Sequence, residues 1–121
     1  MNILVVEDNL YLRKTLWELL SGFGHEVVVA SDIQEAKLFL ETNGVDLLLT
    51  DLNIGPELGG RILIQFVKQH KVHRVSRVKT ILMSGLPAST LKDEATIAGA
   101  DGFLEEFMIG GLKQLIEEVM R

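Results

Sequence analysis

Five short apolar segments recur along the chain, and each interval between them is long enough for one helix. The segments are rich in aliphatic and β-branched residues and lie at 3–6, 26–30, 46–50, 79–84 and 101–104. Segments that are apolar on both faces are typical of strands in a parallel sheet that is covered on both sides. This recurrence constrains the fold more than any other feature of the sequence.

Apolar residues at helical spacing fill the four intervals and the stretch after the last segment, and they predict five amphipathic helices. The expected buried faces are Leu12, Leu16, Leu19, Leu20 and Phe23; Ala36, Phe39 and Leu40; Ile62, Leu63, Phe66 and Val67; Leu91, Ala95 and Ala98; and Leu112, Leu115, Ile116 and Val119. Ser31 and Gln34 form a capping-box pair before the second helix. The small-residue stripe within 88–98 predicts a loosely held helix. Strands that alternate with helices predict an α/β sheet with right-handed crossovers and helices on both faces.

Length and composition exclude several classes of protein. The chain has 121 residues, which suit one domain over 1–121 and are too few for two. The absence of cysteine excludes disulfides and thiolate metal sites. The net charge of -5 disfavours nucleic acid as a direct partner and suits a cation, so the basic stretch 71–79 is interpreted as a solvated connection. Apolar runs too short for a membrane span, and an N-terminus without a basic region, predict a cytoplasmic protein with no membrane contact.

Acidic and hydroxyl side chains stand at the ends of the predicted strands, where ligands bind in sheets of this kind. Glu7 and Asp8 follow the first strand, Asp51 ends the third, and Ser84 ends the fourth. Each has a simpler interpretation as well: the acidic pair can cap the first helix, Asp51 can begin a turn, and Ser84 with Gly85 is an ordinary turn signal.

The conjunction of these groups points to a metal. Three carboxylates on one rim repel each other and raise each other's pKa. A hard divalent cation such as Mg²⁺ relieves that repulsion, and Mg²⁺ in proteins is typically held by one or two carboxylates together with a phosphate. We therefore predict a Mg²⁺ site formed by Glu7, Asp8 and Asp51.

The sequence resembles the receiver domain of two-component response regulators over nearly its whole length. The resemblance rests on ILVVEDN, LLLTDLNIGPELGG, ILMSG and GADGFLEE, which together are specific. It implies a flavodoxin-like, doubly wound (βα)5 sandwich whose five-stranded parallel sheet has the order 2-1-3-4-5. It also implies a signalling domain rather than an enzyme, which acts on a downstream effector protein or output domain.

The resemblance implies a role for each matching residue. Asp51 is expected to accept a phosphoryl group from a histidine kinase or phosphotransfer protein. Asp8 is expected to bind Mg²⁺ directly, Glu7 to bind it through water, and Asn53 to offer it a backbone carbonyl. Ser84 is expected to bond a phosphoryl oxygen, and Phe103 to be the switch aromatic that turns inward with it.

The sequence departs from the family at Glu106, which stands where the family carries a lysine that pairs with the phosphoryl oxygens. Two unit charges about 4 Å apart interact by roughly 4 kcal/mol at an effective dielectric constant of about 20. Reversing the charge can therefore cost several kcal/mol if Glu106 faces the acceptor, and little if it points to solvent. The sequence leaves both arrangements open. The loop 52–60 is also expected to be one residue longer than is usual in the family.

Three functions compete at this point. The first is a phosphorylated receiver, and the second is a degenerate receiver that binds partners without phosphate, which only Glu106 favours. The third, an aspartate-nucleophile phosphohydrolase, needs a second Asp where the chain has Asn53. The sequence does not identify the kinase, the stimulus, the output or the oligomeric state, nor does it separate a stand-alone receiver from part of a longer protein.

Overall fold

The structure, a computed structural model, describes residues 1–121 except the side chain of Phe107. Five parallel strands form one sheet in the order β2-β1-β3-β4-β5, which confirms the predicted flavodoxin-like topology. The strands are β1 (Asn2–Val6), β2 (Glu26–Ala30), β3 (Leu47–Asp51), β4 (Lys79–Ser84) and β5 (Gly102–Glu105). Each bound lies within one residue of the segment predicted from sequence.

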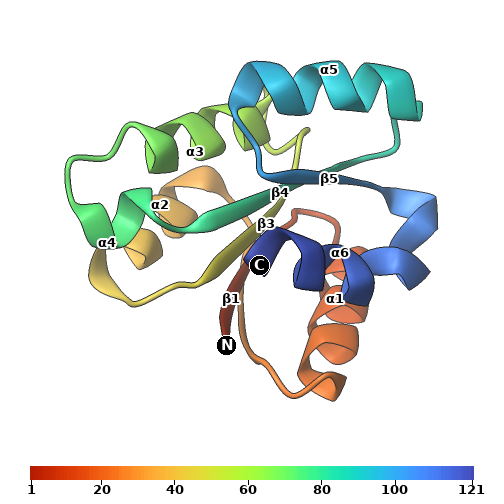
Figure 1. Cartoon of the computed structure of the whole chain (residues 1–121), viewed down its shortest axis with the longest axis horizontal. Coiled ribbons are helices and arrows are strands. Elements are labelled where there is room, and N and C mark those ends of the chain that lie inside the picture. Colours follow the sequence, from red (N-terminus) through yellow and green to blue (C-terminus); the bar gives the residue numbers. More distant parts are fainter.

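Helices cover both faces of this sheet (Figure 1). One face carries α1 (Leu10–Gly22) and α6 (Leu112–Met120), and the other carries α2 (Ile33–Thr42), α3 (Gly59–Lys68), α4 (His73–Ser76) and α5 (Ala88–Ala98). A 3-10 helix, η1 (Glu106–Gly111), joins β5 to α6 and was not predicted. Within the described residues, none of the helices combines the length and the apolar character that crossing a membrane requires.

Successive residues of each central strand enter different cores. In β1, Leu4 and Val6 pack toward α2 and α3, whereas Ile3 and Val5 pack toward α1 and α6. Side chains of a strand point alternately to the two sides, so only a strand covered on both faces is apolar throughout. The edge strand β2 departs from this expectation, because Val28 is 40% exposed where no further strand adjoins it.

Two predicted helix faces need correction. In α3 the buried positions are Leu63, Ile64 and Val67, whereas Ile62 is 40% exposed. Ile62 and Ile64 are equally apolar, so the helix rotation was decided by packing against β3 and β4. Phe23 is not on the buried face of α1 but caps its C-terminus at the surface. The narrow stripe predicted for α5 is buried as expected.

The N-cap of α2 is Asp32 and not Ser31. The Asp32 backbone is extended, and its carboxylate accepts a hydrogen bond from Glu35 N at 2.8 Å. A side-chain acceptor at the N-cap satisfies an amide of the first helical turn that has no partner within the helix. The capping-box prediction was therefore wrong by one residue.

The basic stretch 71–79 is more than a solvated connection. It contains α4, and Val75 and Val78 are buried in the core. The guanidinium of Arg74 donates hydrogen bonds to the carbonyls of Leu40, Glu41 and Asn43 at the C-terminus of α2. These carbonyls lack partners within the helix, so Arg74 caps α2 from a distant part of the chain.

Candidate functional site

Three carboxylates from adjacent strands lie together at the carboxyl edge of the sheet. Asp51 is the last residue of β3, and Glu7 and Asp8 directly follow the neighbouring strand β1. Parallel pairing places Val6 opposite Thr50, so the two strand ends are level. One oxygen from each of the three carboxylates lies within 4.8 Å of the others. The three acids can therefore share one ligand.

The acidic pair does not cap the first helix. Asn9 is the N-cap of α1, and its side chain accepts a hydrogen bond from Leu12 N at 3.0 Å. Glu7 Oε1 accepts from Asn9 N at 3.2 Å, which turns the chain between β1 and α1. The second oxygen of Glu7 and the carboxylate of Asp8 are left for another role.

Burial and mutual repulsion perturb this cluster. Glu7 is 2% exposed and Asp51 is 7% exposed, whereas Asp8 faces solvent. Burial first, and then the charge of Asp51, raises the pKa of Glu7 to about 8. Burial likewise raises the pKa of Asp51. The hydrogen bond that Asp51 accepts from Asn53 N at 3.3 Å lowers this pKa but does not offset the effect of burial. Charged carboxylates are disfavoured here unless a positive group joins them.

The donors fit a hard divalent cation. Glu7 Oε2 is buried and has no hydrogen-bond partner among the described residues. A buried polar atom of this kind is rare and calls for an explanation, of which an ion is one. Three carboxylates, one of them open to water, offer the all-oxygen environment that Mg²⁺ prefers. The cluster can therefore bind Mg²⁺.

Ser84 and Phe103 come from the two strands beyond β3. Ser84 is fully buried, and its Oγ accepts a hydrogen bond from Leu86 N at 3.2 Å, so the turn interpretation is correct. The hydroxyl proton is not used in that bond and can be donated to a further acceptor. Phe103 lies in β5 opposite Leu82 and packs, half-buried, against the core on the α5 side.

Glu106 faces the site. It is half-buried, and a Cβ placed on Gly85 would lie 3.3 Å from its Oε2. Its carboxylate therefore lies alongside the turn that follows Ser84. Burial, followed by the charge of Asp51, raises the pKa of Glu106. Of the two arrangements left open by the sequence, the structure has the one in which Glu106 lies on the side of Asp51, at the turn after Ser84.

Three neighbours of the site were not identified from sequence. The guanidinium of Arg13 donates to the carbonyl of Glu7 at 3.0 Å, and the Thr50 hydroxyl donates to the carbonyl of Asp51 at 3.0 Å. Gly60 lies against the backbone of β3, since a Cβ there would be 2.7 Å from Leu52 Cα and closer still to Asp51 O. The Gly59-Gly60 pair was the only available signal, because it places two residues without side chains at the start of a helix.

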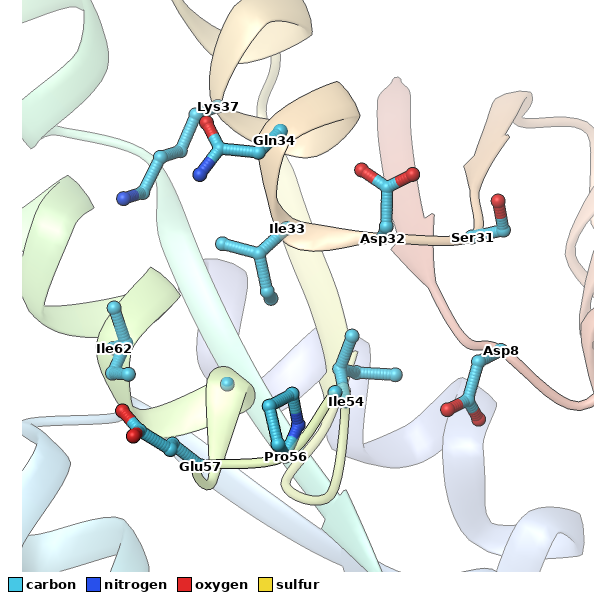
Figure 2. Close-up of a pocket in the computed structure, with 12 residues that line it drawn as sticks. Asp8, Ser31, Asp32, Ile33, Gln34, Lys37, Ile54, Pro56, Glu57 and Ile62 are labelled. Carbon is cyan, nitrogen blue, oxygen red and sulfur yellow. The ribbon is translucent and has the colours of Figure 1, made fainter.

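A groove of about 580 Å³ adjoins the cluster on the β2 side. Figure 2 shows Asp8 at one end of this groove and Lys37 near the other, with Ile33, Ile54 and Pro56 between them. The groove lies between α2 and the loop after β3, so Asp8 belongs to the acidic cluster and also lines this groove.

The topology and the position of the site define a flavodoxin-like α/β protein with a candidate metal site at the carboxyl edge of its sheet. The family model for the response regulator receiver domain matches residues 3–117. The chain therefore belongs to the response regulator receiver domain family.

Curated relatives agree with this assignment. The gliding motility regulatory protein of Myxococcus xanthus is 33% identical over 110 residues, which are 91% of this chain and 14% of that protein. The KDP operon transcriptional regulatory protein KdpE of Escherichia coli (strain K12) is 32% identical over 121 residues, which are 99% of this chain and 51% of that protein. The chain thus spans about half or less of these relatives.

Solved structures share the fold. A two-component response regulator of the LuxR family from Aurantimonas has a TM-score of 0.83 at 25% identity, over 98% of this chain and 84% of that one. TrrA from Thermotoga maritima, solved in complex with Mg²⁺ and BeF, has a TM-score of 0.82 at 23% identity, over 98% and 97% of the two chains. The predicted family and fold are confirmed.

Proposed function

We propose that this chain is a phosphorylated receiver in a two-component relay, with Asp51 as the acceptor. The observation that supports the proposal is the convergence of Glu7, Asp8 and Asp51 at the carboxyl edge of the sheet. Family membership makes the chain a signalling domain rather than a conventional enzyme. The phosphodonor is a phosphohistidine on a histidine kinase or phosphotransfer protein.

In the transfer step, a carboxylate oxygen of Asp51 attacks the phosphorus atom of the phosphohistidine. The new O–P bond forms as the P–N bond breaks, and the electron pair of that bond returns to the imidazole, which takes up a proton. Glu7, Asp8, Asp51 and the backbone carbonyl of Asn53 would hold Mg²⁺. When bound, Mg²⁺ neutralises and orients the phosphoryl oxygens.

Ser84 and Phe103 would convert the new charge into a change of shape. The Ser84 hydroxyl can donate to a phosphoryl oxygen and so move toward Asp51. The half-buried ring of Phe103 would then turn inward beside α5. A downstream effector or output domain would read the altered surface.

A second candidate function rests on Glu106. A carboxylate that borders the acceptor repels the incoming phosphoryl group, which favours a degenerate receiver that binds partners without phosphate. We rank this function second because the convergence of Glu7, Asp8 and Asp51 supports the first.

Intact-mass spectrometry after incubation with phosphoramidate and Mg²⁺ tests both functions. We expect one phosphoryl group on the wild type, none after addition of EDTA, and none on Asp51→Asn. The matched control is Asp93→Asn, an exposed aspartate on α5, which should label like the wild type. Labelling that persists in Asp51→Asn would refute the acceptor assignment.

Glu106→Lys separates the two candidates. If the wild type takes up no phosphoryl group and Glu106→Lys does, the degenerate receiver is the better description of the natural chain. We expect both proteins to be labelled, with Glu106→Lys labelled faster.

A further inference from the structure

Glu106 leaves the phosphoryl-transfer site short of positive charge. Glu7, Asp8 and Asp51 already form one cluster, and Glu106 adds a fourth carboxylate beside Ser84. A phosphoryl group brings further negative oxygens, and a single divalent ion cannot offset all of these charges. Phosphoryl transfer depends on neutralising the charge spread over these oxygens. A second cation beside Glu106 would relieve this repulsion.

Among the described residues, no ion pair joins a basic side chain to Glu106. Arg13 donates to the carbonyl of Glu7 and thereby holds the backbone after β1. Other basic residues with contacts away from the site are Lys14, Lys37, Arg61, Lys68, Arg74 and Lys113. The charged group that acts on Glu106 is Asp51, another acid. The second cation is therefore expected from outside the chain.

Exposed apolar residues stand close to the acidic residues along the chain. Leu10 is 63% exposed and Tyr11 is 83% exposed directly after Asp8, and Met108 is 60% exposed two residues after Glu106. Aromatic residues and methionine are enriched in protein interfaces, and charge complementarity selects the partner. The complementary surface is a basic side chain surrounded by apolar ones.

We propose that a lysine or arginine of the phosphodonor protein enters this site and pairs with Glu106, so that the partner supplies the second cation. The inference rests on the proposed function and identifies the chemistry of the donor. Glu106 would thus be a specificity determinant: it repels a phosphoryl group that arrives without a cation and attracts a donor that carries one. Cations supplied in trans accelerate phosphoryl transfer in other systems by about 10³-fold or more.

Free guanidinium can replace the partner's side chain in a rescue experiment. Phosphoramidate labelling is followed by intact mass at saturating Mg²⁺ and constant ionic strength, with millimolar guanidinium or with tetramethylammonium, which has no N–H donor. Because free guanidinium lacks the positional advantage of a docked side chain, we expect a saturable acceleration of only about tenfold in the wild type. Tetramethylammonium should have no effect.

The variants assign the effect to Glu106. Glu106→Gln should label faster than the wild type without guanidinium and gain nothing from it. Glu106→Lys should be labelled quickly, and guanidinium should not change its rate of labelling. Glu105→Gln, which removes the adjacent carboxylate, is the matched control and should respond to guanidinium like the wild type.

Three results would overturn the inference. One is wild-type labelling that ignores guanidinium, and another is equal acceleration of the wild type and Glu106→Gln. The third is a second-order dependence on Mg²⁺ that Glu106→Gln abolishes, because a second metal ion would then take the place of the partner's cation. An absence of labelling in every protein, Glu106→Lys included, would instead refute the proposed function itself.

Discussion

Replacing Glu7 with glutamine tests whether the buried acid destabilises the metal-free protein. Burial first, and then the charge of Asp51, raises the pKa of Glu7 from 4.5 to about 8. The folded chain therefore keeps a proton over a pH range in which the unfolded chain has lost it. Wherever the folded state binds more protons, stability falls as the pH rises. The loss contributed by Glu7 thus begins near pH 4.5 and is complete above about pH 8.

The size of this effect follows from the shift. Each pKa unit corresponds to about 1.4 kcal/mol, so the upper limit of the loss is roughly 5 kcal/mol. Asp51, whose pKa is also raised, acts in the same direction and remains in the variant. Glu7→Gln keeps the shape of the side chain and removes its titration. We therefore expect this variant to be more stable than the wild type at pH 8 in EDTA, and to have a shallower dependence on pH between 5 and 8.

Urea unfolding at pH 5, 6, 7 and 8, with EDTA and then with Mg²⁺, measures both expectations. Mg²⁺ should stabilise the wild type at pH 8, because binding to the folded state alone raises its stability by mass action. It should stabilise Glu7→Gln much less. If the free energy of unfolding fell equally steeply with pH in the two proteins in EDTA, the assignment of this loss of stability to Glu7 would be refuted.

Three further changes test the framework of the site and of the helices around it. Gly60→Ala should lower the free energy of unfolding by about 1–3 kcal/mol in thermal unfolding, because its Cβ would meet the backbone at the end of β3. Gly22→Ala is the control, because the space around Gly22 is open, and it should be neutral or stabilising by up to about 1 kcal/mol. Equal effects of the two substitutions would contradict the close approach of Gly60 to that backbone. Arg74→Met should lower the free energy of unfolding by about 2 kcal/mol and speed amide hydrogen exchange in the last turn of α2, because Arg74 caps the carbonyls there. Unchanged exchange would rule out that role. Lys68→Met should raise the pKa of Asp101 in an NMR titration. Burial alone would raise that pKa, but Lys68 at 2.8 Å and the Thr80 amide lower it. The ion pair therefore stabilises the fold above about pH 4 and is lost as the pH falls, and because it is partly exposed we expect less than about 1 kcal/mol.

The strands were the elements predicted most accurately from the sequence. The central strands are apolar throughout because both faces are buried, and this pattern does not depend on the details of packing. The edge strand β2 shows where the rule ends, because Val28 is as apolar as its neighbours and yet exposed. Helix faces were less certain, since Ile62 and Ile64 differ only in which one meets the sheet.

The residues of the candidate site also differ in whether the sequence could predict them. Glu7, Asp8 and Asp51 could be found from sequence because the topology of a parallel sheet brings its carboxyl ends to one edge. Arg13 and Gly60 could not, because their contacts depend on how closely α1 and α3 approach the strand ends.

The succession of strands and helices could be predicted from sequence because periodicity is a local property of the chain. The acids at the carboxyl edge followed from that succession, because parallel strands bring their carboxyl ends to one edge. The packing of the elements decided that Asn9, and not the acidic pair, caps α1. It also left one oxygen of Glu7 buried without a hydrogen-bond partner among the described residues. The same packing placed Glu106 at the turn after Ser84, on the side of Asp51. A side chain's direction and its access to water depend on every element packed around it, and no stretch of sequence records that environment.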